Sequence, residues 1–250
     1  MRRLLPLLCL LLALPSATLA QPARFNPAAD YITSGQDEPG YRAWLTAVPY
    51  RAMFVQGFDH YLTIYGVAGI VPTWQLMRTA TDWQRCAADP FEVPPPSEWA
   101  NLVETLRYIR AHVVPVVGPV EPVSVYRNPA LNACAGGASE SAHRHLFAVD
   151  MVPLRATDRN ALIRGLCAIH AWQGSGFDVG MGFYKGLRFH VDSMRYRKWG
   201  ADGRDGSTSC AATLAAIEAQ AAASRAAIAS RAAAVAAPDP RVSPDPLSAR

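Results

Sequence analysis

The pattern of apolar and polar residues along the chain predicts short strands that alternate with helices. After residue 97, apolar residues recur at three- and four-residue spacings as far as residue 113, which predicts an amphipathic helix that Ser97 could cap. Residues 113–126 read VVPVVGPVEPVSVY, a β-like stretch whose prolines indicate a position near a sheet edge. Residues 148–154, AVDMVPL, predict a short buried strand.

Two further elements complete this pattern. Residues 157–174 predict a second helix, capped by Thr157 or Asp158 and ended by Gly174. Residues 179–194, VGMGFYKGLRFHVDSM, predict a β-hairpin with the KG pair at its turn. Together the elements predict an α+β fold, in which helices pack on one side of a small, mainly antiparallel sheet.

The region before residue 96 has a less regular pattern. Residues 21–50 are polar and predict irregular structure. Residues 50–76 are aromatic and apolar and end in GVAGIVPTWQL, which is strand-like, and residues 89–99, DPFEVPPPSEW, predict a stiff connector. We therefore expect residues 21–95 to form an N-terminal segment packed on a core of residues 96–210.

The two ends of the chain differ from its middle. Residues 1–20 join a basic head to an apolar run and end in small residues, which predicts a secretory signal peptide. An N-terminal anchor is the weaker interpretation, because polar residues and prolines follow at once. We expect a periplasmic or secreted protein with no membrane span after cleavage. Residues 211–250 predict an alanine-rich helix and then a disordered, proline-rich tail.

Composition and cysteine content fit an exported globular domain. Half of the residues are hydrophobic, 18% are charged and the formal net charge is +4. No Lys/Arg run interleaves with aromatic residues, so nothing indicates a nucleic-acid partner. The even number of cysteines after the signal peptide indicates two disulfides with three possible pairings, and the spacing is too wide for a zinc ribbon. These cysteines are Cys86, Cys134, Cys167 and Cys210.

The candidate chemistry centres on SESAHRHLFAVD, residues 139–150. A catalytic zinc site needs three protein ligands and one open position. If a strand begins at residue 146, Asp150 points to one sheet face, and the loop that carries His143 can fold over it. A buried carboxylate needs a metal, a cation or several hydrogen-bond donors. His190, on the predicted neighbouring strand, is the best candidate for a third ligand.

Each histidine also has an ordinary interpretation. A single histidine on an apolar strand, such as His190, is more often a hydrogen-bonded core residue than a ligand. His60, His112 and His170 are given that interpretation. His145 could be a ligand by proximity or a pocket residue that touches substrate.

Three blocks of sequence resemble a known family. SAHRHLFAVD resembles the Ser-x-His-x6-Asp signature of the zinc D-Ala-D-Ala carboxypeptidases and related murein endopeptidases, whose superfamily includes lysostaphin-type enzymes and the hedgehog signalling domain. Upstream, SVYRNPALNACAGGASES is similar to the family's Tyr-Arg segment, with its Asn and its Gly-Gly-Ala turn. Downstream, FHVDSMRYRKWG resembles the His-x-Asp strand and Arg-x-Trp of one branch. The blocks run in the family's order over residues 124–200.

The resemblance implies a fold and an activity. It implies a hedgehog-like domain with Zn²⁺ in an open cleft, held by His143, Asp150 and His190. It implies that Arg127 holds a substrate carboxylate. The expected substrates are peptidoglycan stem peptides, cut between two D-residues by amide hydrolysis. Removal of a terminal D-Ala is the first expectation, and cleavage of a D-D cross-link is close behind it.

The general base is not specified by the resemblance. Many relatives carry an acid three residues before the last histidine, where this chain has Leu187. Asp192 shares a strand face with His190, so it could act as the base. It could equally hold His190 in place or pair with Arg195. The weaker candidates for the base are Asp178 and Glu140.

The remaining residues of the motifs extend this site. Ser141 could orient a ligand or accept a hydrogen bond from the loop backbone. The phenol of Tyr184 could steady a developing oxyanion, although a core aromatic is the more common role. Leu146 stands where the family has a glycine, which changes the expected shape of the loop more than its ligands. The order of the cysteines suggests Cys86–Cys134 and Cys167–Cys210.

Two other classes of function stay open. A zinc-containing but inactive cell-wall-binding module would bind metal and wall without turnover. An exported structural or interaction protein, with histidines that only fill the core, would hold no stoichiometric metal.

Overall fold

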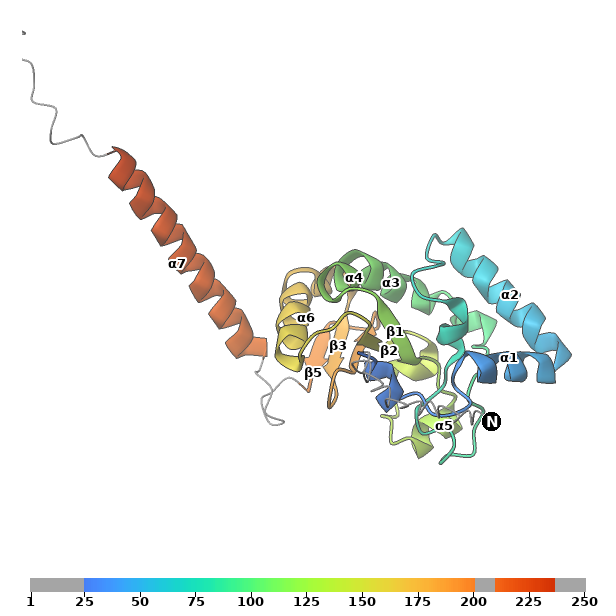
Figure 1. The fold of residues 1–250 in the computed structure, drawn as a ribbon. Helices are drawn as coiled ribbons and strands as arrows, with labels where there is room; N and C mark the ends of the chain where they lie inside the picture. Colours follow the sequence, from blue (N-terminus) through green and yellow to red (C-terminus); the bar gives the residue numbers. More distant parts are fainter. Residues whose placement is uncertain (1–24, 201–209, 237–250) are drawn as a thin grey trace, which may run out of the picture.

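The computed structural model describes residues 25–200 and 210–236, and its centre is a five-stranded mixed sheet. The strand order is β1-β2-β4-β3-β5 (Figure 1). Three neighbouring pairs are antiparallel and the β3–β5 pair is parallel. The α+β class and the mainly antiparallel sheet are therefore confirmed. The strands are β1 (Val120–Ser124), β2 (Ala148–Pro153), β3 (Gly180–Phe183), β4 (Phe189–Asp192) and β5 (Arg197–Trp199).

The two faces of the sheet carry different chemistry. On β2 and β4, Val149, Met151 and Val191 point to one face and join the main hydrophobic core beneath the helices. The alternate residues, Asp150 and His190, point to the opposite face and lie directly across from each other. Because side chains alternate along a strand, burial of the apolar face presents these polar residues together on the other face.

A continuous helical run packs on the apolar face of the sheet. It consists of α3 (Asn101–Tyr108), a π-helical turn (Ile109–Val113) and α4 (Val114–Val117). Pro115 has no backbone N–H to donate, so the regular hydrogen-bond ladder is interrupted at this point. The predicted cap at Ser97 is wrong, because this residue lies inside a short 3-10 helix and makes no capping hydrogen bond.

The second predicted helix and the hairpin are confirmed. Helix α6 (Arg159–Gln173) begins where the carboxylate of Asp158 accepts a hydrogen bond from Ala161 N at 2.8 Å, so Asp158 is the cap. The chain leaves this helix at Gly174 through a 3-10 turn (Gly174–Phe177). Strands β3 and β4 form the antiparallel hairpin. Helices α3, α4 and α6 lie along one side of the sheet (Figure 1).

The N-terminal region corrects two predictions. Residues 38–47, expected to be irregular, form α1 (Glu38–Ala47), which Asp37 caps at Gly40 N. The strand-like stretch forms no strand: α2 (Pro49–Ile64) is followed by turns and a 3-10 helix (Thr73–Met77). The apolar residues of this stretch are buried by contact with the helical core, so their apolar character marked burial rather than extended backbone.

The N-terminal segment also touches the sheet. A 3-10 helix (Pro27–Asp30) places Ala28 against Val123 and Val152 in a small separate cluster. The segment therefore covers part of the sheet face that carries Asp150.

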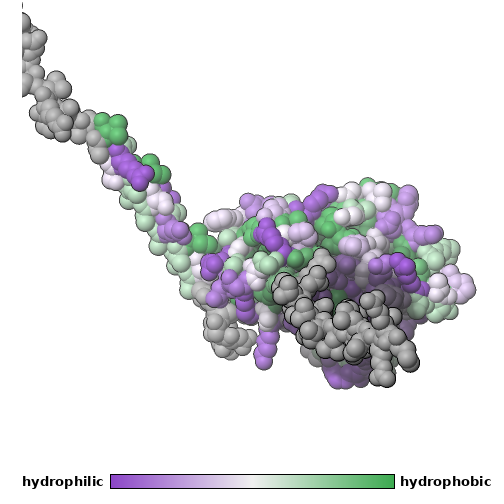
Figure 2. Space-filling model, in the orientation of Figure 1, coloured by the Kyte–Doolittle hydropathy of each residue, from purple (hydrophilic) through white to green (hydrophobic). Residues whose placement is uncertain are grey.

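The cysteines pair as the order in the chain suggested. The structure joins Cys86 to Cys134 and Cys167 to Cys210. The second bond fixes the start of α7 (Cys210–Ala236), the predicted alanine-rich helix, to α6. Most of α7 projects from the body with a mixed polar and apolar surface (Figures 1 and 2).

The predicted signal peptide and proline-rich tail lie outside the described residues. Within residues 25–200 and 210–236, no helix has the length and apolar character needed to cross a membrane.

Candidate metal centre

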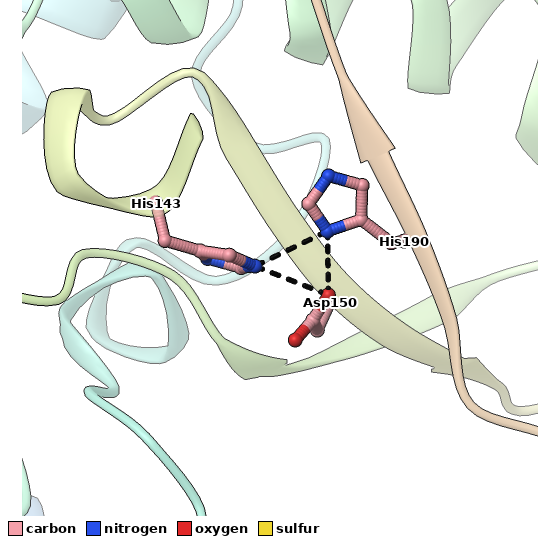
Figure 3. A group of neighbouring side chains, drawn as sticks. All are labelled: His143, Asp150 and His190. Carbon is pink, nitrogen blue, oxygen red and sulfur yellow. Dashed lines mark hydrogen bonds and ion pairs between the residues drawn. The ribbon is translucent and has the colours of Figure 1, made fainter. Parts of the chain in front are cut away.

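Three side chains from three elements converge on the polar face of the sheet (Figure 3). His143 lies on a 3-10 turn (Ala142–His145), Asp150 on β2, and His190 opposite it on β4. His143 Nε2 lies 3.2 Å from Asp150 Oδ1 and 3.1 Å from His190 Nδ1. His190 Nδ1 lies 2.8 Å from the same Asp150 oxygen. All three residues are buried, so this group could hold a metal ion.

The hydrogen-bond partner of the outer ring nitrogen of each histidine determines which of its two nitrogens carries the hydrogen. His143 Nδ1 lies 2.6 Å from the carbonyl oxygen of Val125, which can only accept, so Nδ1 carries the hydrogen. His190 Nε2 lies 2.8 Å from the carboxylate of Asp192 and donates in the same way. When both rings are neutral, their inner nitrogens present lone pairs toward the Asp150 carboxylate. The three atoms then need a cation between them, which can be a proton on His190 or a metal ion.

The distances fit a metal with short bonds. Two ligand atoms bonded to zinc at about 2.05 Å with a tetrahedral angle are about 3.3 Å apart. The three distances observed, from 2.8 to 3.2 Å, are close to this value and slightly shorter. Two imidazoles and one carboxylate also match the ligand number of a catalytic site that keeps one position open.

The electrostatic environment acts differently on the two histidines. Burial and the positive charge of Arg127 lower the pKa of His143 to about 4, so its ring is neutral at pH 7. Burial also disfavours the charged form of His190, but hydrogen bonds to Asp150 and Asp192 outweigh it and raise the pKa of His190. In the absence of a metal, a proton that enters the centre therefore resides on His190.

The second oxygen of Asp150 is held by two arginines. Arg127 Nη2 lies 2.7 Å from Oδ2, and Arg188 Nη2 lies 2.5 Å from the same atom. The phenol of Tyr184 donates to Oδ1 at 3.2 Å. Burial favours the neutral acid, but His143, Arg188 and the hydrogen bonds to the centre hold the pKa of Asp150 well below its usual range. Asp150 can thus offer a metal only Oδ1.

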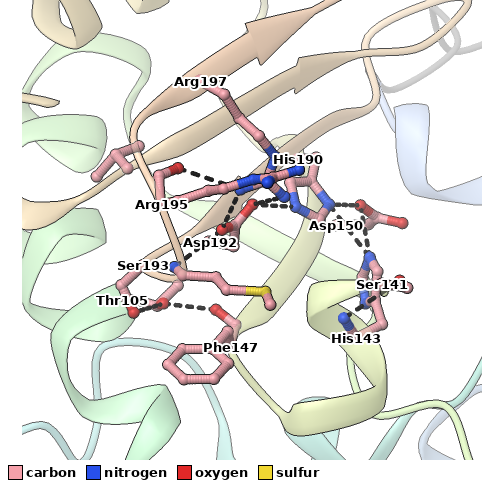
Figure 4. A network of polar contacts seen from close by, with 12 residues as sticks. Thr105, Ser141, His143, Phe147, Asp150, His190, Asp192, Ser193, Arg195 and Arg197 are labelled. Atoms are coloured by element: carbon pink, nitrogen blue, oxygen red, sulfur yellow. Dashed lines mark hydrogen bonds and ion pairs between the residues drawn. The ribbon is translucent and has the colours of Figure 1, made fainter. Parts of the chain in front are cut away.

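Asp192 lies behind His190 as seen from the centre (Figure 4). Its Oδ2 accepts from His190 and pairs with Arg197 Nη2 at 2.9 Å, and its Oδ1 accepts from Met194 N at 2.9 Å. Burial raises the pKa of Asp192, but these contacts outweigh burial and lower it. The position favours the interpretation in which Asp192 holds His190. The assignment of Asp192 as the base stays a prediction without a direct contact to the centre.

The expected pairing of Asp192 with Arg195 is not made. Strand β5 runs parallel to β3 and brings Arg197, opposite Gly180, next to Asp192. A side-chain carbon at Gly180 would lie 2.1 Å from the Asp192 carboxylate, so only glycine leaves room for this pair.

A cleft of about 450 Å³ opens on the histidines of the centre. Arg127, Ser141 and Tyr184, three of the four residues expected to bind substrate, line it. The fourth, His145, does not line it: its side chain is 40% exposed and lies 3.8 Å from Glu98. The cleft is rich in cations, with Arg127, Arg188, Arg195 and Arg197 in its walls.

Two residues of the site were missed or underrated from the sequence. Arg188 forms an ion pair with Asp150. The sequence signal for Arg188 was its position two residues before His190, because residues two apart along a strand share one face. The ring of Trp199 lies 4.8 Å from that of His190, centroid to centroid, and reaches it across Gly182. Trp199 thus supports a ligand ring in addition to packing.

The loop before β2 adopts a left-handed turn at Leu146, although a leucine stands there in place of the expected glycine. Leu146 has φ 54°, in the left-handed region, and its side chain is fully buried. Ser141 caps the 3-10 turn, where its hydroxyl accepts from His143 N at 3.4 Å. Packing of the leucine side chain therefore holds a backbone conformation that a glycine would adopt freely.

Comparison of the chain with protein-family models, with curated proteins and with solved structures gives no significant match.

Proposed function

We propose that the protein is an exported zinc metallopeptidase that hydrolyses D-Ala-D-Ala-type bonds in peptidoglycan stem peptides. Removal of a terminal D-Ala is the main reaction proposed, and cleavage of a D-D cross-link is the second. The observation that carries the proposal is the convergence of three lone-pair atoms, from His143, Asp150 and His190, at the floor of a cleft. The two disulfides are consistent with export.

Zinc suits the ligand set. Imidazole nitrogen and carboxylate oxygen are both common zinc ligands, and three of them leave the fourth position free. When bound, zinc lowers the pKa of a water from about 16 toward about 7 and polarises a carbonyl group.

The arginines of the cleft provide for the anionic end of a peptide. Arg127 donates through Nε to Ser124 at 3.0 Å and through Nη2 to Asp150, and among the described residues its Nη1 has no hydrogen-bond partner. Arg195 is exposed at the cleft and pairs with no carboxylate among the described residues. A carboxylate next to the scissile bond can therefore be bound by these two guanidinium groups.

The proton of the attacking water needs an acceptor on the open side of the centre. Both oxygens of Asp192 are occupied, and His190 separates them from the centre. Glu140 lines the cleft, and within the described part of the chain it forms no ion pair or hydrogen bond. We therefore propose Glu140 as the base, with Asp192 as a positioning residue.

The test measures metal content and product on the same sample. Protein without residues 1–20 is assayed for zinc per chain and for D-Ala release from a muropeptide pentapeptide, with His190→Ala as the variant and His112→Ala as the control. One zinc per chain and D-Ala release, both lost only in His190→Ala, is the expected result. A wild-type protein without zinc would contradict the whole assignment.

A zinc-containing wall-binding module is the second candidate. It is favoured by Leu187, which stands where relatives have an acid, and by the position of Asp192 behind His190. This candidate predicts one zinc per chain and muropeptide binding, with no product from monomeric or cross-linked muropeptides.

A further inference from the structure

A second cavity, of about 350 Å³, lies beside the metal cleft. Its volume falls in the range of about 300–1,000 Å³ that is typical of small-molecule sites. The residues that line it are Trp44, Tyr50, Arg51, Ala88, Asp89, Phe91, Glu92, Val93 and Asn128. None of these residues belongs to the metal centre.

The two cavities share a wall. Arg127 lines the metal cleft, and the next residue, Asn128, lines the second cavity. The loop before residue 90 also contributes to both cavities, since Asp82 lines the metal cleft and Asp89 lines the second cavity. The Cys86–Cys134 disulfide joins this loop to α5 (Pro129–Cys134). Neighbouring residues of the same two segments therefore line both cavities.

The charges of the second cavity are largely neutralised within it. Arg51 Nη2 pairs with Asp89 at 2.9 Å, and the guanidinium lies 4.6 Å from the ring centroid of Trp44. Glu92 accepts from Asn128 Nδ2 at 2.8 Å through Oε2, and its Oε1 has no partner within the described part of the chain. The cavity therefore offers planar hydrogen-bonding groups without a strong field of one sign.

The cavity also has an apolar surface and an unpaired donor. Tyr50 is 60% exposed at its mouth, and Phe91 forms part of a buried floor. The indole N–H of Trp44, a lining residue that is only 7% exposed, has no hydrogen-bond partner among the residues that the structure describes. Buried indole donors normally have a partner, so this one indicates an incomplete polar environment.

These features select a class of ligand. A pyranose ring has an apolar face that stacks on an exposed aromatic ring and a rim of hydroxyls that bind carboxylate, amide and guanidinium groups. A dianionic ligand would meet Glu92, and a purely apolar ligand would leave the polar side chains unpaired. We propose that the second cavity binds a neutral sugar ring and, in the reaction proposed above, holds the glycan to which the stem peptide is attached. The link to the glycan rests on the proposed function, whereas sugar binding does not.

The test uses chitotetraose, a neutral N-acetylglucosamine oligomer, as the probe. Binding to the zinc-loaded protein is measured by calorimetry for wild type, Tyr50→Ala and Glu92→Gln. The matched control is Tyr65→Ala. Tyr65 is an exposed tyrosine that follows α2, the helix that contains Tyr50, and it lies outside the cavity. D-Ala release is measured in parallel on a free pentapeptide and on the same peptide attached to its disaccharide.

We expect a tenfold or greater loss of chitotetraose affinity in Tyr50→Ala and Glu92→Gln, and none in Tyr65→Ala. We expect both cavity variants to raise KM for the glycan-linked peptide only. Absence of chitotetraose binding in wild type, or binding that all three variants retain, would overturn the proposal. Binding of a cationic, peptide-like compound, N-acetyl-lysine methylamide, in place of chitotetraose would also overturn the proposal. Sugar binding with no D-Ala release would remove the proposed peptidase and leave the sugar site standing.

Discussion

Two buried charged groups in this molecule, around Arg78 and around Asp150, are assembled in opposite ways. Arg78 is 1% exposed, and its guanidinium donates to Gln36 O at 2.9 Å, to Glu121 at 2.9 Å and to Pro122 O at 2.6 Å. Each contact joins a donor to an acceptor. At the candidate metal centre, two imidazole nitrogens and a carboxylate oxygen face one another, and all three are acceptors when both rings are neutral.

The difference distinguishes a charged group that only stabilises the fold from a charged group that can bind a ligand. The charge of Arg78 is balanced within the chain by the carboxylate of Glu121, and two carbonyl oxygens accept from the same guanidinium. The Asp150 group is balanced on its outer side by Arg127 and Arg188 but is incomplete on the side that opens to the cleft. Burial alone does not distinguish them, because both groups are nearly inaccessible to solvent.

The largest expected effect comes from Asp150→Asn. Zinc affinity should fall by more than about 100-fold, because a charged ligand is lost. The free energy of unfolding should fall by about 3–5 kcal/mol, because the buried Arg127 and the largely buried Arg188 lose their shared carboxylate. Zinc per chain after dialysis and urea unfolding measure the two effects. A variant that keeps one zinc would show that Asp150 is a structural residue like Glu121.

The complementary change is Arg78→Met. The free energy of unfolding should fall by about 3 kcal/mol, since a buried ion pair loses one partner. Zinc per folded chain should not change. Arg42→Met, which removes an exposed pair with Glu38, is the control and should stay within about 0.5 kcal/mol of wild type. Loss of zinc in Arg78→Met would mean that the two groups are coupled.

Asp192→Asn should act on the metal through His190. Removal of the carboxylate that fixes the ring should weaken zinc binding by about 10–100-fold. Competition with a chelator of known affinity gives this number. Glu104→Gln, at an exposed ion pair with Arg107, should leave zinc affinity unchanged. Unchanged affinity in Asp192→Asn would instead support Asp192 as a base that acts only in turnover.

The pH dependence of zinc binding should follow His190 rather than His143. The pKa of His190 is raised from its ordinary value near 6.5, whereas that of His143 is lowered to about 4. A proton competes with the metal, so affinity should fall as pH falls through the raised pKa, by about tenfold per pH unit. Chelator competition between pH 5 and 8 measures it. A zinc affinity that stays constant between pH 5 and 8 would contradict the assignment of the proton to His190.

The smallest expected effect is a difference in stability between two variants of Leu146, in the loop before β2. Leu146→Gly should be more stable than Leu146→Ala by about 1 kcal/mol, because a left-handed backbone costs alanine about that much. Both variants should be less stable than wild type, since they lose the buried leucine side chain. Thermal unfolding of the pair gives the difference. Equal stabilities would mean that the loop changes its turn when the leucine is removed.

The convergence of Asp150 and His190 was predictable because strand geometry is local. A two-residue period puts Asp150 on one face of β2, and the same period puts His190 and Asp192 on one face of β4, with Arg188 just before it. The turns and 3-10 helix after α2 were not predictable in the same way, since residues 66–76 carry apolar side chains without a clear period. The partner of Asp192 depended on the parallel pairing of β5 with β3, a contact between distant segments that no local pattern encodes.

The Cys86–Cys134 bond makes the wall between the two cavities depend on oxidation. The sheet, and with it the metal ligands, needs no disulfide to form its ladder of hydrogen bonds. The wall that separates the cleft from its neighbour joins two segments 48 residues apart and is closed by this bond. A copy of the chain still in a reducing compartment would therefore assemble its metal ligands and lack a fixed wall. In the exported peptidase proposed above, the rigid wall would therefore form only after export.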